Sequence, residues 1–529
     1  FFFVQSDCRR LFSTVSSNCS TMVVAFATPC VPGVLNASQI VGRCVPICDH
    51  RYIVQHRAKQ TPLSRTISFS SRNVSRFSFT QRRDFFRGIK LAVQALPAPR
   101  NNKMAVVSAS ADFTKIDGGI TAPKGFKAAG MTAGLKASGL PDFAAIFSET
   151  DAVAGGVFTT CRVCAAPVTY CREAIKKSPS SIRAVVINSG QANAATGDDG
   201  WKDAIYTSEA ASTALGVPSS AILLASTGVI GQRIKLKEYE AALPTLFSKL
   251  GSDEASAAAA AKAIMTTDLV PKTVAFESTL SNGMTFRVGG MCKGSGMIHP
   301  NMATMLAFLT CDAKVAPALW QSLFSRAADK SFNQVTVDGD TSTNDTFVGL
   351  ANGAADPSGP AISDPTSADA LKVEAMVTAA SQYLAKCIAR DGEGATVLFE
   401  TTVTGGATDA DARLVARTII GSSLVKSAVF GRDPNWGRIA AAAGRAGVDF
   451  DQRDLRIELG PFVLMDKGQP LPFDRKGASE YMKTAAAGEY LVSDTVAVKV
   501  SIGSGPGSGV AYGCDLTYDY VKINAEYTT

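Results

Sequence analysis

The sequence predicts a globular chain of the α/β or α+β class from about residue 108 onward. Apolar residues make up 46% of the chain and charged residues 19%, a balance typical of folded proteins. Beyond residue 108, short apolar runs alternate with stretches of helical periodicity, the pattern of sheets combined with helices. No uninterrupted apolar run reaches the roughly 18 residues that a membrane-spanning helix needs, so we expect no membrane span.

The first elements are predicted from apolar runs and a helix start. Continuous apolar runs predict buried strands at Ala184–Ile187 and Ile222–Ala225. An alanine-rich helix is predicted from Ser252 to about Met265, because Asp253 and Glu254 suit the positive end of the helix dipole.

A β-hairpin turn and a surface loop are predicted in the middle of the chain. Val274–Leu280 and Met284–Val288 flank Asn282-Gly283, a pair typical of tight turns, which predicts a β-hairpin. Residues 351–369 are rich in Gly, Pro, Ser and Asp and predict a surface loop.

The C-terminal part alternates helices with a long hairpin. Glu374–Arg390 is predicted to be an amphipathic helix, with Gly392 as its C-cap. Asp433-Pro434 has the order of a cap residue followed by proline at the first helical position, which predicts another helix. Val496–Ile502 and Val510–Thr517, joined by a glycine-rich segment, predict a hairpin.

Residues 1–104 differ in composition from the rest of the chain. They hold 15 Lys and Arg but only 3 Asp and Glu, a net charge of +12, whereas the remainder has a net charge of −5. An Arg-rich, Ser-rich, acid-poor leader is typical of an organelle transit peptide, and a disordered basic tail or a nucleic-acid arm is the alternative. We expect no nucleic-acid role for the remainder, and a plastid is favoured over a mitochondrion as the destination.

Cysteine and histidine usage argues against metal chemistry. Cys161 and Cys164 have CxxC spacing, but no second pair at zinc spacing follows. They lie in a strand-like run in which they would face opposite sides, so we expect buried free thiols in a reducing compartment. With only three histidines, a Ser-His-Asp hydrolase and a multi-histidine metal centre are nearly excluded.

Residues 289–313, GGMCKGSGMIHPNMATMLAFLTCDA, are chemically the most informative segment. Four glycines from Gly289 to Gly296 allow a tight, irregular backbone, and Met305–Leu309 predicts a buried strand. Thr304 therefore stands where a constrained loop enters the core, a place that can hold a nucleophile rigidly. Phosphate binding by the glycines is disfavoured, because P-loops and dinucleotide-binding loops run into a helix.

A hydroxyl nucleophile needs a base, and the scarcity of histidine leaves a lysine or the nucleophile's own α-amine. The amine becomes free only if the peptide bond before Thr304 is cut. The Thr304 hydroxyl would attack the Ala303 carbonyl, and water would hydrolyse the resulting ester. The freed amine, with a pKa of about 8, can accept a proton near neutral pH. A threonine that starts a core strand behind a glycine loop is also a common structural feature, so the residues alone leave both interpretations open.

The segment KGSGMIHPNMATMLAF resembles the processing segment of the ornithine acetyltransferases, also called bifunctional glutamate N-acetyltransferases. The resemblance covers essentially residues 108–529. It implies an α+β fold of the layered α/β sandwich type of these self-processing enzymes, with the active site between an α and a β chain and a smaller C-terminal α/β domain. The other matching motifs are VFTTCRVCAAPV (157–168), INSGQANAATG (187–197), STGVIG (226–231), MTTD (265–268), DGDTSTNDT (338–346), ARDGEGAT (389–396), FGRDPNWGRI (430–439) and the terminal INAEYTT.

The resemblance implies cleavage between Ala303 and Thr304. The α chain would be residues 105–303 and the β chain 304–529. Within the β chain, about 304–403 would complete the main domain and about 404–529 would form the C-terminal domain.

The resemblance also assigns site residues. Thr304 would be the nucleophile, and the Thr227 hydroxyl and the Gly228 N–H would form the oxyanion hole. Lys293 suits a substrate carboxylate, and Glu393 suits the δ-ammonium of ornithine. The remaining substrate contacts would be Thr267, with Thr266 not excluded, Thr304 itself, and the terminal residues Asn524 and Thr529.

The implied reaction moves the acetyl group of N2-acetylornithine to Thr304 and then to glutamate. It needs no metal or cofactor, and acetyl-CoA as a second donor is left open. Two α and two β chains would assemble in the plastid stroma, with the mitochondrial matrix as the alternative. A related self-processing aminopeptidase or amidohydrolase, with water as acceptor, is the alternative function.

Overall fold

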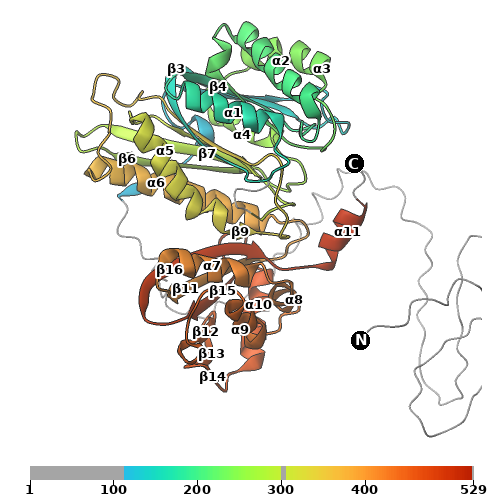
Figure 1. Ribbon diagram of the computed structural model, residues 1–529, viewed down its shortest axis with the longest axis vertical. Helices are drawn as coiled ribbons and strands as arrows, with labels where there is room; N and C mark the ends of the chain where they lie inside the picture. Colours follow the sequence, from blue (N-terminus) through green and yellow to red (C-terminus); the bar gives the residue numbers. More distant parts are fainter. Residues whose placement is uncertain (1–111, 300–304, 527–529) are drawn as a thin grey trace, which may run out of the picture. The chain divides into compact units, whose positions relative to one another are not determined.

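The computed structural model describes residues 112–299 and 305–526. The predicted leader, residues 1–104, lies outside the described residues. The described chain contains two β-sheets with helices packed against them, so the predicted α+β class is confirmed (Figure 1).

The first sheet has nine strands in the order β1-β6-β7-β8-β10-β3-β4-β5, with β2 paired to β3. The neighbours β8 and β10 are parallel, as are β4 and β5, and the other pairs are antiparallel. The strands are β1 (Phe113–Ile116), β2 (Phe126–Met131), β3 (Phe143–Phe158), β4 (Ile182–Asn188), β5 (Ile222–Ser226), β6 (Lys272–Thr279), β7 (Thr285–Lys293), β8 (Leu306–Cys311) and β10 (Thr346–Ala351).

Helices cover both faces of this sheet. Two neighbouring glycines of β7 show what covers each face. A Cβ atom added at Gly289 would lie 2.1 Å from the Gly119 carbonyl oxygen, whereas one added at Gly290 would contact the side chain of Leu384 in α6 (Ala368–Arg390). Consecutive strand residues face opposite sides, so β7 lies between the Gly119–Thr121 turn on one face and a helix on the other. The helices of this region are α1 (Ala166–Lys177), α2 (Gly197–Leu215), α3 (Leu236–Ser248), α4 (Glu254–Ala263), α5 (Pro317–Asp329) and α6 (Ala368–Arg390).

The second sheet has seven strands in the order β14-β13-β12-β15-β11-β16-β9. Helix α6 contacts both sheets, through β6 and β7 of the first and through β9, β11 and β16 of the second. Figure 1 shows α6 between the two sheets. The elements are β9 (Val335–Thr336), β11 (Leu398–Gly405), α7 (Asp409–Ile420), α8 (Ser423–Phe430), α9 (Trp436–Gly444), β12 (Arg456–Leu459), β13 (Phe462–Asp466), β14 (Gln469–Pro470), α10 (Arg475–Ala486), β15 (Thr495–Ser501), β16 (Gly505–Cys514) and α11 (Tyr518–Glu526).

Several elements lie where the sequence predicts them. The two apolar runs form β4 and β5, and the apolar run after Thr304 forms β8. Asp253 caps α4 by accepting a hydrogen bond from the Ser256 N–H. Strands β6 and β7 form the predicted hairpin, with Gly283 at a φ of +83° in its turn.

The predicted hairpin near the C-terminus is wrong. Strands β15 and β16 do not pair with each other, because β11 lies between them, parallel to β15 and antiparallel to β16. The local alternation of residues identifies both strands but carries no information about a third strand from earlier in the chain. Residue 404 lies inside β11 rather than between elements.

Three local predictions also need correction. Gly289 and Gly290 belong to the regular strand β7, so the irregular path begins only after Lys293. Helix α6 starts at Ala368 behind the cap Ser367, and Asp391 rather than Gly392 ends it. Helix α9 begins after Asn435, whose side chain accepts the Arg438 N–H, and not at residues 433–434.

The CxxC segment is not a strand. Strand β3 ends at Phe158, and Cys161 and Cys164 lie in the loop before α1. Both are free thiols and only partly buried, so the expectation of burial is wrong for this pair. The other cysteines of the described chain are buried and free, and burial raises the pKa of Cys171 to about 12.

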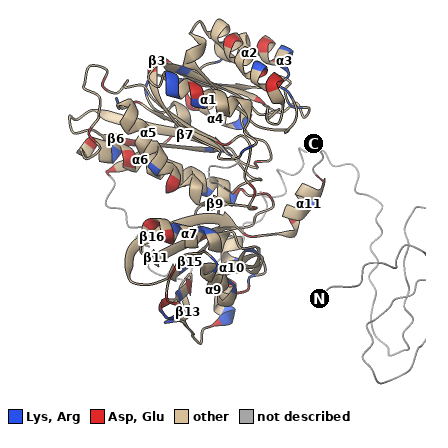
Figure 2. Cartoon of the chain, viewed as in Figure 1, with Lys and Arg blue, Asp and Glu red and all other residues tan. Residues whose placement is uncertain are grey.

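Charged residues of both signs are interspersed over the helices (Figure 2). This agrees with the small net charge of the chain after residue 104. Within residues 112–299 and 305–526, no helix is both long and apolar enough to cross a membrane.

The Trp320→Phe substitution tests the packing of α5 on the first sheet. Trp320 is fully buried, and its indole N–H donates to the Gly349 carbonyl in β10 at 3.0 Å. We expect a loss of about 1–3 kcal/mol of stability, because a buried carbonyl loses its donor and a small cavity forms. The measurement is the urea midpoint of unfolding by circular dichroism. Trp436→Phe is the control, since that indole N–H has no hydrogen-bond acceptor among the described residues; equal losses would contradict the prediction.

Candidate active site

Loops at the ends of several elements enclose a cavity of about 300 Å³. Four of these loops follow β5, α4, β7 and α6, and another precedes β10. Helix α11 also contributes residues to the cavity wall. The cavity brings together residues from Ala192 to Asn524, including all the predicted site residues that the structure describes. These are Thr227, Gly228, Thr267, Lys293, Glu393 and Asn524.

The predicted junction Ala303–Thr304 and the predicted contact Thr529 lie outside the described residues. The chain on either side of the junction is held by carboxylates. The Ile298 N–H donates to Asp338 at 2.9 Å, and the Met305 N–H donates to Asp345 at 2.9 Å.

Thr227 and Gly228 directly follow β5 and present donors to the cavity. The Thr227 N–H donates to the Asn188 carbonyl at 3.0 Å, which fixes the backbone and leaves its hydroxyl without a partner among the described residues. Gly228 has a φ of +118°, and a Cβ atom there would lie 2.3 Å from the Gly190 carbonyl oxygen. Only glycine fits this close approach, and the Gly228 N–H also has no acceptor in the described chain. Two free donors on adjacent residues can stabilise one developing oxyanion.

Lys293 ends β7 and is almost completely buried. Its ammonium donates to the Thr266 hydroxyl at 2.8 Å. Burial lowers the pKa of Lys293, although Asp268 works in the opposite direction. Thr266 and Thr267 both line the cavity, so Thr267 as a substrate contact, with Thr266 as the alternative, stays a prediction.

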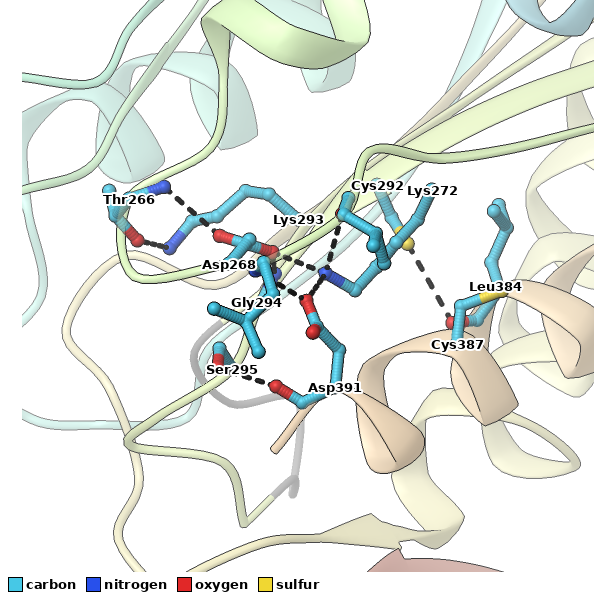
Figure 3. A network of polar contacts seen from close by, with 12 residues as sticks. Thr266, Asp268, Lys272, Cys292, Lys293, Gly294, Ser295, Leu384, Cys387 and Asp391 are labelled. Carbon is cyan, nitrogen blue, oxygen red and sulfur yellow. Dashed lines mark hydrogen bonds and ion pairs between the residues drawn. The ribbon is translucent and has the colours of Figure 1, made fainter. Parts of the chain in front are cut away.

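A buried ionic cluster lies beneath this lysine (Figure 3). The Lys272 ammonium donates to Asp268 and to Asp391, at 2.6 Å each, and none of the three side chains is more than 3% exposed. Burial opposes the ionisation of Asp268, but Lys272 and Lys293 outweigh it and lower the pKa of that carboxyl to about 2. We did not predict a role for Lys272 or Asp391, and only their burial, which the sequence does not display, identifies them.

Glu393 and Asn524 meet at the open side of the cavity. The Asn524 side chain donates to the Glu393 carboxylate at 2.8 Å. The Glu393 N–H donates to the Ser295 carbonyl, and a Cβ atom on Gly296 would lie 2.4 Å from the Glu393 carboxylate. The small residue at 296 therefore makes room for an acid in the cavity wall.

The segment before β10 adds polar residues to which we assigned no role. Ser342, Thr343 and Asn344 line the cavity, and the Asn344 amide donates to the Ala192 and Ser226 carbonyls. Asp345 is fully buried, and one of its carboxylate oxygens has no hydrogen-bond partner in the described chain. Burial raises the pKa of Asp345 well above its usual value. The density of Asp, Thr and Asn in DGDTSTNDT is the sequence feature that could have indicated this wall.

Within the described ranges, no group of three or more His, Cys, Asp or Glu side chains is placed to hold a metal ion. The cavity instead offers an ammonium, a carboxylate, an amide, hydroxyls and a free backbone N–H. These groups can pair with both charges of a small zwitterionic molecule.

Comparison with known proteins identifies the family of this chain. A model of the ArgJ family matches residues 127–529. The chain is 61% identical over 422 residues to the arginine biosynthesis bifunctional protein ArgJ of Synechocystis sp., covering 79% of this chain and 100% of that protein. It is 55% identical over 425 residues to the chloroplastic ArgJ of Physcomitrium patens, covering 80% of each chain. The crystal structure of argJ from Bacillus halodurans is 42% identical and covers 42% of this chain and 100% of that chain, with a TM-score of 0.39. The chain belongs to the ArgJ family.

Proposed function

We propose that this chain is a self-cleaving acetyltransferase that moves the acetyl group of N2-acetylornithine to glutamate in arginine biosynthesis. The single observation that carries the proposal is the convergence of Thr227, Gly228, Lys293 and Glu393 on one cavity. The names of the relatives, arginine biosynthesis bifunctional protein, support the pathway.

Transfer takes place in two steps. Thr304, freed from Ala303 by self-cleavage, attacks the acetyl carbonyl with its own amine as the base, and ornithine leaves. The Thr227 hydroxyl and the Gly228 N–H stabilise the oxyanion in this step and again when glutamate attacks the acetyl ester. One amide replaces another, so the exchange needs no ATP and no metal.

The cavity holds both amino acids by their shared frame. Lys293 pairs with the α-carboxylate, and Thr267 hydrogen-bonds to the same end of the molecule. Glu393, oriented by Asn524, pairs with the δ-ammonium of ornithine. Thr529 completes the contacts from the terminal segment.

The location and the assembly are part of the proposal. Residues 105–303 form the α chain and 304–529 the β chain, joined as two α and two β chains. Relatives named as chloroplastic support a plastid, and residues 1–104 serve as the transit peptide to its stroma. The word bifunctional in the names of the relatives supports acetyl-CoA as a second donor.

The Thr304→Ala substitution tests the proposed function. We expect a single uncut polypeptide without transfer activity, because the hydroxyl both cuts the chain and carries the acetyl group. Denaturing intact-mass analysis measures cleavage, and mass spectrometry of N-acetylglutamate formed from N2-acetylornithine and glutamate measures transfer. Thr304→Ser, which keeps a hydroxyl, is the control. A cut and active Thr304→Ala protein, or wild type that releases acetate at the same rate without glutamate, would contradict the proposal.

The Thr227→Val substitution tests the oxyanion hole. Valine keeps the shape of threonine but removes the hydroxyl donor, so we expect kcat to fall roughly 100- to 1000-fold with little change in KM. Steady-state kinetics on protein shown to be cleaved provide the measurement. Thr227→Ser should retain most of the activity, and a valine variant with a wild-type kcat would remove Thr227 from the mechanism.

The buried ammonium of Lys293 predicts an alkaline limit to substrate binding. Burial lowers its pKa below the ordinary lysine value of 10.5, so the ammonium that binds the carboxylate is lost as the pH rises through that lowered pKa. We expect kcat/KM for N2-acetylornithine to fall at a pH below 10.5, before the δ-ammonium of the substrate itself titrates. Lys293→Met should have a low kcat/KM without this alkaline fall, and an unchanged alkaline fall in that variant would assign it to another group.

A further inference from the structure

Lys272 is a fully buried lysine that none of the proposed catalytic steps uses. It begins β6, and its three ammonium protons meet three acceptors: Asp268 and Asp391 at 2.6 Å and the Val270 carbonyl at 3.2 Å. Its pairing is therefore complete, and it is not available to a ligand. Any influence that Lys272 has on the cavity must pass through the residues to which it is bonded.

Those residues join three segments of the cavity wall. Asp268 accepts hydrogen bonds from the Thr266 N–H at 3.0 Å and from the Gly294 N–H at 2.7 Å. Asp391 accepts from the Leu269 N–H, and its carbonyl accepts from the Ser295 hydroxyl at 2.6 Å. The segments 266–269 and 293–295 and the end of α6 at Asp391 are thus joined through one ammonium (Figure 3). They contain or adjoin the cavity residues Thr267, Lys293 and Glu393.

The charges of Lys272, Lys293 and Lys136 all act on Asp268, but only Lys272 is hydrogen-bonded to it. Lys272 donates to it directly, whereas the Lys293 ammonium points to the Thr266 hydroxyl, next to the cavity. Lys293 is close enough that its charge and that of Asp268 stabilise each other. Without Lys272, a buried carboxylate would be left without a counterion, a costly state that pairing with another ammonium relieves. Lys293 can supply that ammonium, because its charge already acts on Asp268 and its backbone is next to Gly294, whose N–H donates to the same carboxylate.

We propose that Lys272 is a positioning residue that occupies Asp268 and thereby keeps Lys293 available for the substrate carboxylate. The inference rests on the proposed function, in which Lys293 binds that carboxylate. It makes Lys272 a determinant of affinity for carboxylate-bearing substrates, although Lys272 touches no substrate.

The test is Lys272→Met, assayed on the full-length, self-cleaved protein. Methionine fills a similar volume without charge. We expect KM for N2-acetylornithine to rise roughly 10- to 100-fold, with a much smaller change in kcat, because one charge-assisted contact to the ground state is lost. The α-carboxamide analogue of N2-acetylornithine, which lacks the carboxylate, is the matched substrate. Its KM should change by less than about threefold, since it makes no ion pair with Lys293.

Two double variants separate competition for Lys293 from general damage. Lys272→Met combined with Asp268→Asn removes the carboxylate that would capture Lys293, so KM should return to within about fivefold of wild type. Lys272→Met combined with Asp391→Asn removes the other orphaned carboxylate but leaves Asp268 free to pair with Lys293, so KM should stay high. Intact mass and thermal unfolding establish that each variant is cleaved and folded.

The outcomes distinguish this inference from the function on which it rests. Wild type that does not transfer acetyl to glutamate removes the proposed function itself. If wild type transfers acetyl, an unchanged KM in Lys272→Met overturns the inference alone. Equal losses with both substrates, equal behaviour of the two double variants, or failure of the single and both double variants to fold would assign Lys272 a structural role only and overturn it as well.

Discussion

The Lys272 ammonium between two buried carboxylates is the interaction on which the cavity of this ArgJ-family protein depends. It satisfies Asp268 and Asp391, each of which also accepts backbone N–H groups from neighbouring segments. A buried pair of this kind adds little net stability compared with apolar packing, but losing one partner is costly. The cluster therefore fixes the positions of the wall segments relative to one another, because an arrangement that left a buried charge unpaired would be costly.

The opposite wall is built from backbone geometry rather than from charge. Strands β4 and β5 run parallel, and the chain leaving β5 passes so close to Gly190 that only a glycine fits at 228. This closeness directs the Thr227 hydroxyl and the Gly228 N–H into the cavity. The site thus combines a rigid pair of neutral donors with a buried ammonium, and a carbonyl and a carboxylate of one small molecule can use both.

Much of the fold and of the site could be predicted from the sequence. Caps and apolar runs located α4, β4, β5 and β8, because these features act within a few residues of one another. The resemblance of motifs identified Thr227, Lys293, Glu393 and Asn524, which share one cavity. The polar wall at Ser342–Asn344 and the partner of Lys293 were not predicted, since both depend on contacts between distant segments.

The sequence by itself determined several local elements and, through its motifs, the family, and it predicted site residues that share one cavity where the structure describes them. Only the tertiary structure decided that β11 separates β15 from β16, that the CxxC cysteines lie in a partly exposed loop, and that Lys272 holds Asp268 and Asp391. The physical reason is the separation in sequence between the residues that interact. Helix caps, turns and apolar periodicity are set by neighbours in the chain, whereas the order of β15, β11 and β16 and the pairing of Lys272 with Asp391 depend on residues that are distant in the sequence.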